Sequence, residues 1–93
     1  MDGVIVELYS SAFCAPCRTA RRVVHDAARL VPAAQVSEFD VADDVERAAA
    51  QQITSTPTIV VRDGAGREVF RAAGAPRLPH LLAAMARAVP PEG

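Results

Sequence analysis

Cys14 and Cys17 are the only cysteines in this chain of 93 residues, and two residues separate them. They follow an apolar run at residues 4–9 and stand where a helical pattern begins, near Pro16. A helix N-terminus exposes unpaired backbone N–H groups and the positive end of the helix dipole, and both stabilise a thiolate. We therefore predict that Cys14 is a nucleophile. Cys17, in the first helical turn, can then reach the sulfur of Cys14 while its own sulfur faces inward.

The first half of the chain predicts the elements that hold this pair. Residues 4–9 are apolar almost throughout, which is typical of a strand covered on both faces in a largely parallel sheet. From 15 to 30 the apolar residues recur at helical spacing, until Pro32 ends the helix. Residues 35–41 alternate between apolar and polar side chains and predict a second strand. Strand, helix and strand together indicate a right-handed parallel crossover.

The second half predicts a short helix, a β-hairpin and a last helix. Asp43 and Asp44 place acids in the first turn of the short helix, where the dipole favours them. Gly74 separates the hairpin from the last, amphipathic helix. The expected ranges are 43–52 for the short helix, 58–62 and 67–71 for the hairpin strands with a turn at 63–66, and 78–89 for the last helix.

Length and charge limit the classes of function. We expect one domain over residues 1–93, with 90–93 as a frayed tail. The net charge of -1 argues against a nucleic-acid surface or a polybasic membrane anchor. No stretch approaches the roughly 18 apolar residues of a membrane span, and the N-terminus carries no leader pattern. We therefore expect a cytoplasmic protein, in which a close cysteine pair is catalytic or metal-binding.

Thr56 and Pro57 stand at the entrance of the strand expected at 58–62. A proline is wrong for a central strand but suits a cis peptide bond at its start. A cis bond there would turn the backbone polar groups of Thr56 outward beside Cys14. We expect those groups to pair with an extended substrate segment, as an added strand would.

With these features the chain resembles the thioredoxin superfamily from residue 4 to about 89. The resemblance rests on the strand, Cys14-Ala15-Pro16-Cys17, the following helix, the Thr56-Pro57-Thr58 strand entrance, the hairpin, Gly74-Ala75 and the last helix. It implies an α/β fold of three layers (α/β/α), with a minimal βαβαββα core and a four-stranded mixed sheet. Because the sequence shows no counterpart of the N-terminal strand and helix of thioredoxins, we expect a core of glutaredoxin size.

The resemblance also implies an activity. Cys14 would attack a protein disulfide, Cys17 would resolve the mixed disulfide, and a reductase such as thioredoxin reductase would recycle the protein. No cofactor or metal is implied, and we expect a monomer. The expected substrate-binding residues are Phe13, Ala15, Pro16, Thr56, Pro57 and Gly74.

Several residues depart from the family pattern. Phe13 replaces the usual Trp, so an aromatic rim remains, and Ala15-Pro16 replaces Gly-Pro. The family's buried Asp corresponds to Leu8, which leaves Glu7 as the nearest acid. Glu7 is either a proton acceptor for Cys17 or an edge or surface-facing strand residue. The segment Gly74-Ala75-Pro76-Arg77 lacks the glutathione-gripping pattern of glutaredoxins, which favours a protein substrate.

Other functions remain open at this point. One alternative is a non-catalytic carrier or adaptor for a metal or an iron–sulfur cluster, and another is a dedicated electron donor to one enzyme. His25 and His80 lack the spacing of a Cys2His2 zinc site. Arg18 either helps to hold the Cys14 thiolate or is simply solvated.

Overall fold

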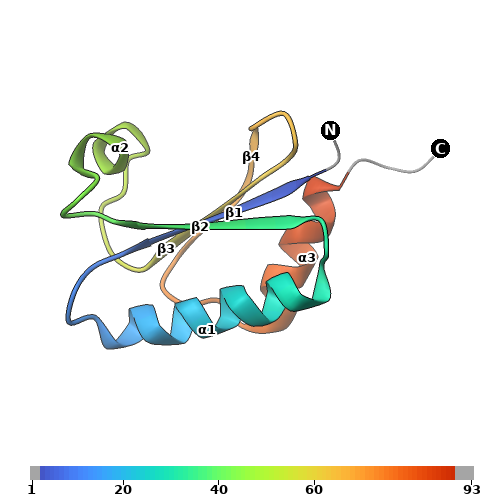
Figure 1. Ribbon diagram of the computed structural model, residues 1–93, viewed down its shortest axis with the longest axis horizontal. Coiled ribbons are helices and arrows are strands. Elements are labelled where there is room, and N and C mark those ends of the chain that lie inside the picture. The colour runs from blue at the N-terminus through green and yellow to red at the C-terminus, as the bar shows by residue number, and fades with distance from the viewer. Residues whose placement is uncertain (1–2, 90–93) are drawn as a thin grey trace.

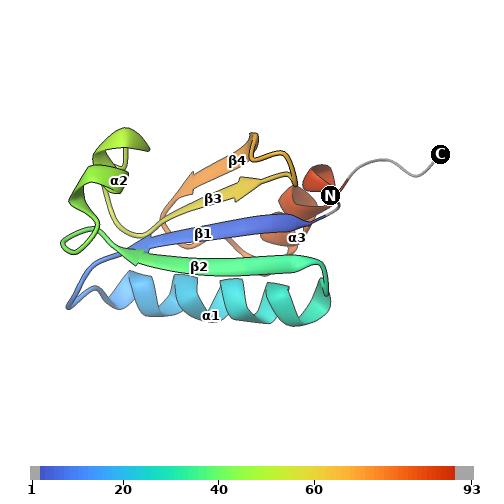
Figure 2. The same cartoon turned by 45° about the horizontal axis from the view of Figure 1, so that its top comes forward.

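The computed structural model describes residues 3–89, which form four strands and three helices (Figure 1, Figure 2). The expected frayed tail, residues 90–93, lies outside the described residues. In the part of the chain that is described, no helix is long and apolar enough to cross a membrane. The elements are β1 (Val4–Ser10), α1 (Ala15–Leu30), β2 (Ala34–Asp40), α2 (Val45–Ala50), β3 (Thr58–Arg62), β4 (Glu68–Ala73) and α3 (Leu78–Ala88).

The strands form one mixed sheet in the order β2-β1-β3-β4. β1 and β2 are parallel and α1 connects them, so the predicted crossover is confirmed. β3 is antiparallel to both β1 and β4. The α/β class, the element order and the four-stranded mixed sheet therefore agree with the sequence-based expectation.

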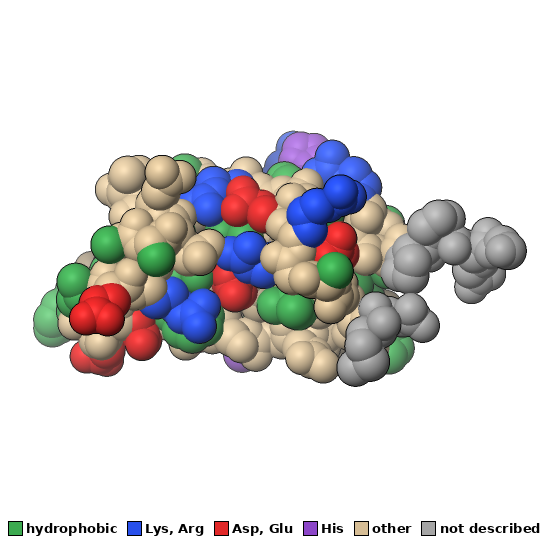
Figure 3. Space-filling model, turned by 90° about the horizontal axis from the view of Figure 1, so that it is seen from above, with side chains coloured by type: hydrophobic (Ala, Val, Ile, Leu, Met, Phe, Trp, Pro, Cys, Tyr) green, Lys and Arg blue, Asp and Glu red, His purple; other side chains and the backbone are tan. Residues whose placement is uncertain are grey.

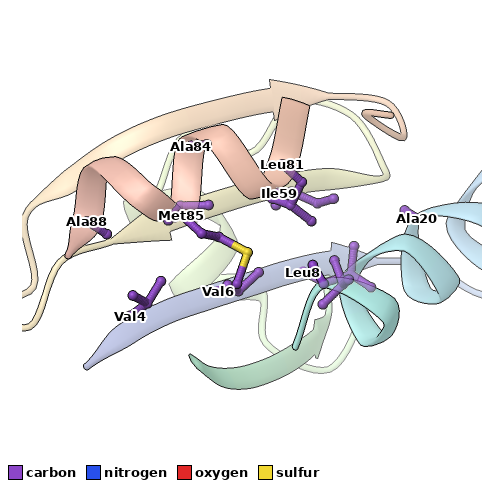
Figure 4. Packing of buried hydrophobic residues seen from close by; sticks show 12 residues of the cluster. Val4, Val6, Leu8, Ala20, Ile59, Leu81, Ala84, Met85 and Ala88 are labelled. Atoms are coloured by element: carbon purple, nitrogen blue, oxygen red, sulfur yellow. The ribbon is translucent and has the colours of Figure 1, made fainter. Parts of the chain in front are cut away.

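Alternate residues of β1 build the main core. Val4, Val6 and Leu8 point toward α1 and α3, because successive side chains of a strand point to opposite faces of the sheet. Figure 4 shows the side chain of Met85 reaching from α3 toward Val6. The core cluster comprises Val4, Val6, Leu8, Ala20, Val24, Ala27, Ile59, Val61, Leu81, Ala84, Met85 and Ala88.

The opposite face of the sheet has little helical cover. Only α2, six residues long, lies on that side, at the end near the cysteine turn (Figure 1, Figure 2). The third layer of the expected architecture is therefore one short helix. Arg62 and Arg71 both donate to Gln51 at the end of α2, so their side chains cross this face. Figure 3 shows arginine and acidic side chains gathered along its middle.

The helix α2 is shorter than the range 43–52 that the sequence predicted. The N–H groups of Asp43 and Asp44 donate to the carbonyl of Asp40 at 3.0 and 2.9 Å, so both residues belong to the turn after β2. At the other end, Gln52 has a φ of 57°, which is left-handed and cannot continue a helix. Asp43 and Asp44 therefore stand before the helix, and the acid in its first turn is Glu46.

Candidate active site

The cysteine pair lies where β1 passes into α1. β1 ends at Ser10, α1 begins at Ala15, and Cys14 is the N-cap residue between them. The Cys14 sulfur accepts a hydrogen bond from the backbone N–H of Cys17 at 3.2 Å. Pro16 occupies the first helical turn, where its missing N–H leaves no acceptor unsatisfied. The local sequence therefore directs the backbone N–H of Cys17 toward the sulfur of Cys14.

Cys14 and Cys17 form a disulfide with their Cα atoms 5.2 Å apart. The two residues differ in access. Cys17 is 1% exposed, whereas Cys14 is partly exposed. A molecule arriving from solvent therefore meets the sulfur of Cys14 first.

Phe13 extends from the turn into solvent. Its side chain is fully exposed, and its φ of 56° lies in the left-handed region that few bulky residues adopt. Beside it is an open pocket of about 390 Å³. The pocket is lined by Ser11, Ala12, Phe13, Cys14, Ala15, Arg18 and Arg21. The exposed Arg18 thus shares a pocket with the accessible cysteine.

The segment around Pro57 lies next to the cysteine turn. The Thr56-Pro57 peptide bond is cis, the isomer that the sequence favoured. The hydroxyl groups of Ser11 and Thr56 form a hydrogen bond at 2.8 Å, which joins segments that are 45 residues apart in sequence. The structure therefore brings the Thr56-Pro57 bond to the turn that carries Cys14.

Gly74 is tied to the same region. Its N–H donates to the carbonyl of Pro57 at 2.8 Å. Its φ is 92°, and a Cβ added there would meet no atom of the chain within 4 Å. Glycine is thus required by the backbone conformation, and not by a close approach of another part of the chain.

The structure does not bring Glu7 together with Cys17. Leu8 points toward α1, so Glu7, its neighbour in β1, points to the opposite face. There it accepts hydrogen bonds from Tyr9 and Arg62, each at 3.1 Å. The hypothesis that Glu7 takes the proton of Cys17 finds no support in this geometry. The alternative of an edge or surface-facing residue is also wrong, because Glu7 is 7% exposed and lies on an interior strand.

Glu38 is a residue near the site that sequence analysis missed. It pairs with Leu8 across β1 and β2 and lies on the α1 face. The Arg21 side chain donates to its carboxylate from α1, with the shortest distance 2.6 Å, and the hydroxyl of Ser10 donates at 2.8 Å. The only signal in the sequence was the alternation of the 35–41 segment, which does not identify a partner on another element.

The carboxylate of Glu38 predicts an acid-sensitive contribution to stability. Hydrogen bonds from Arg21, aided by Ser10, hold its pKa below the ordinary value despite the opposing effect of partial burial. A folded-state pKa below the unfolded one stabilises the fold above the unfolded value, about 4.3, and this stabilisation is lost as the pH falls through the folded value. The free energy of unfolding of the wild-type protein should therefore fall between pH 7 and pH 3. In Glu38→Gln we expect this fall to be smaller by about 0.5 kcal/mol.

Urea unfolding at both pH values measures this difference. Arg21→Leu is the companion variant, because it removes the main hydrogen-bond donor and leaves the carboxyl group. It should show the same weakened pH dependence as Glu38→Gln. A wild-type pH dependence in both variants would contradict the assignment.

Comparison with known proteins identifies the family. The family model described as Thioredoxin matches residues 1–87, and the chain belongs to the thioredoxin family. A thioredoxin from Methanocaldococcus jannaschii is 36% identical over 62 residues, which make up 66% of this chain and 73% of that protein. The resemblance predicted from the sequence is therefore confirmed.

Solved structures agree with this assignment. Thioredoxin from Fasciola hepatica is 30% identical with a TM-score of 0.80, over 92% of this chain and 81% of that one. A mutant thioredoxin from Halobacterium salinarum superposes with a TM-score of 0.86 at 22% identity, over 99% of this chain and 80% of that one, and shows the shared fold. The family and the close cysteine pair together define a thioredoxin-like disulfide oxidoreductase.

Proposed function

We propose that this protein reduces disulfide bonds in other proteins by cycling Cys14 and Cys17 between dithiol and disulfide. The observation that carries the proposal is the asymmetric pair at the start of α1. One sulfur is partly exposed and accepts a backbone N–H, and the other is buried beside it. Membership of the thioredoxin family supports the same reaction.

The reaction begins with attack by the Cys14 thiolate on one sulfur of a substrate disulfide. The substrate bond breaks, its second sulfur leaves as a thiolate that takes a proton from water, and Cys14 remains in a mixed disulfide. Cys17 loses its proton and attacks the Cys14 sulfur, which expels the other substrate sulfur. Two electrons pass to the substrate. Because Cys17 is already held beside Cys14, this second step is effectively unimolecular.

Substrate docking is proposed to involve the residues around the pair. The exposed ring of Phe13 offers an apolar contact beside the pocket that Cys14 lines. The Thr56 backbone is proposed to pair with an extended substrate segment, as an added strand would. Phe13, Ala15, Pro16, Thr56, Pro57 and Gly74 make up the proposed docking surface.

The oxidised pair must be reduced again after each turnover. We propose that a reductase dithiol, such as that of thioredoxin reductase, supplies the two electrons, and that the protein acts as a monomer in the cytoplasm, where such thiols are kept reduced. Within residues 3–89, no group of three or more His, Cys, Asp and Glu side chains is placed to hold a metal ion.

Insulin reduction tests the proposal. The prereduced protein is mixed with insulin without other thiols, and free thiols are counted on both proteins after acid quenching. We expect one insulin disulfide to be reduced for each Cys14–Cys17 disulfide formed. Precipitation of the insulin B chain should become catalytic when dithiothreitol is added. A rate equal to that of dithiothreitol alone would refute the proposed function.

A further inference from the structure

A hydrogen bond between two hydroxyl groups joins the cysteine turn to the segment before Pro57. Ser11 stands three residues before Cys14, and Thr56 directly precedes Pro57. Their oxygen atoms are 2.8 Å apart, and either hydroxyl can be the donor. No other side-chain hydrogen bond among residues 3–89 connects the turn 11–13 to another part of the chain.

The two segments that this hydrogen bond joins are not equally well held in place by other contacts. In the segment around Pro57, the hydroxyl of Thr58 donates to the carbonyl of Ser55 at 2.8 Å. The backbone N–H of Gly74 donates to the carbonyl of Pro57, also at 2.8 Å. In the cysteine turn, the backbone of Phe13 is in the left-handed conformation and its ring is exposed to solvent. The left-handed conformation strains a bulky residue, and this strain favours relaxation of the turn unless another contact opposes it.

Ser11 also lies between two surface pockets. The pocket of about 390 Å³ contains Cys14, and a second pocket of about 330 Å³ contains Thr56. Ser11 lines both. A substrate segment that reaches the sulfur of Cys14 and also pairs with Thr56 therefore crosses the hydrogen bond between the two hydroxyl groups. The second pocket is lined by Ser11, Val41, Ile53, Thr54, Ser55 and Thr56.

We propose that Ser11 and Thr56 form a positioning pair for protein substrates. Their hydrogen bond holds the cysteine turn against the segment before Pro57, so that the Cys14 sulfur and the Thr56 backbone face one substrate segment together. This role rests on the proposed function. It concerns protein disulfides in particular, because a small disulfide needs the sulfur of Cys14 and no contact with Thr56.

Ser11→Ala and Thr56→Val remove the hydroxyl groups with little change in shape. Each variant is expected to lower kcat/KM for insulin about fivefold, the effect of one lost hydrogen bond, mainly through a higher KM. The double variant should be no worse than either single one, because both remove the same bond. With hydroxyethyl disulfide, Ser11→Ala should change the rate by less than twofold. Ser11→Thr, which keeps a hydroxyl, should restore activity toward insulin.

Ser37→Ala is the matched control, because Ser37 is exposed on β2 and takes no part in the site. It should behave as wild type toward both substrates. Hydrogen exchange tests the hydrogen bond between Ser11 and Thr56 without relying on catalysis. Ser11→Ala should speed exchange of the amides of residues 12–14 about fivefold, and it should lower the global folding equilibrium constant by no more than the same factor.

Three results overturn the proposal. They are a Ser11→Ala variant that equals wild type toward insulin, equal losses toward insulin and hydroxyethyl disulfide, and additive losses in the double variant. If wild type reduces no insulin, the proposed function itself fails and the positioning role fails with it. If wild type reduces insulin and Ser11→Ala reduces it at the same rate, only the positioning role of Ser11 and Thr56 is refuted.

Discussion

Replacing Cys14 with serine is expected to lower insulin reduction by at least about a thousandfold, because a hydroxyl at neutral pH is neither ionised nor able to form a disulfide. The fold should survive the change, since Cys14 is a partly exposed N-cap and serine is a favoured N-cap residue. Initial rates of insulin B-chain precipitation, corrected for dithiothreitol alone, measure the loss. Far-ultraviolet circular dichroism verifies that the variant is folded.

Cys17→Ser is the matched control, with the same atom exchanged three residues away. This variant keeps the nucleophile, so we expect one rapid attack on insulin and then accumulation of a mixed disulfide, visible as a covalent adduct in intact-protein mass spectrometry. Iodoacetamide at neutral pH should label Cys14 of the reduced wild-type protein first, because Cys17 is buried. Faster labelling of Cys17, or an adduct formed by Cys14→Ser in place of Cys17→Ser, would reverse the two assigned roles.

The sequence predicted those parts of the site that depend on local order along the chain. Cys14 and Cys17 are three residues apart at a helix start, so their proximity follows from helix geometry alone. The adjacency of Thr56 to the cysteine turn is a long-range contact, and it was expected from the proline at the entrance of the strand at 58–62. The contact between Ser11 and Thr56 was not foreseen, since the types of two hydroxyl residues 45 positions apart do not indicate a partner.

The error at Glu7 has a different origin. Alternation along β1 was available in the sequence, and it places Glu7 and Leu8 on opposite faces. The proton-acceptor hypothesis rested on the closeness of Glu7 to Leu8 in the sequence. It did not take into account the face of the sheet on which the carboxylate of Glu7 lies. The apolar run also predicted that β1 is covered on both faces. On the face of Glu7 the cover includes the side chains of Arg62 and Arg71, which reach from β3 and β4 to Gln51 at the end of α2.

Those arginine contacts depend on strand register. Arg62 faces Ile5 across β1 and β3, and it reaches Glu7 only because of that pairing. It also donates to Gln51 and, at 3.2 Å, to the carbonyl of Gly66. The side chain of Arg62 thus links β1, the end of α2 and the β3–β4 turn. The periodicity of the sequence does not predict such a link.

Arg62→Met is expected to lower the free energy of unfolding by about 2 kcal/mol, because it leaves a buried carboxylate without its main partner. Losing one member of a buried ion pair costs up to about 5 kcal/mol, but Arg47 remains 3.7 Å from Glu7 and offsets part of the loss. The hydroxyl of Tyr9, which is neutral at pH 7, continues to donate to Glu7. The loss is measured by urea unfolding at pH 7 with circular dichroism.

Arg67→Met is the matched control for this prediction. Arg67 pairs with Asp63 at 3.7 Å on the surface, and its side chain is 82% exposed, so the same substitution should cost less than about 0.5 kcal/mol. The double variant Glu7→Gln with Arg62→Met should regain about 1 kcal/mol over Arg62→Met, because it removes the unpaired charge while the amide oxygen still accepts from Tyr9. Equal losses in Arg62→Met and Arg67→Met would show that the sheet face opposite α1 does not depend on this ion pair for its stability.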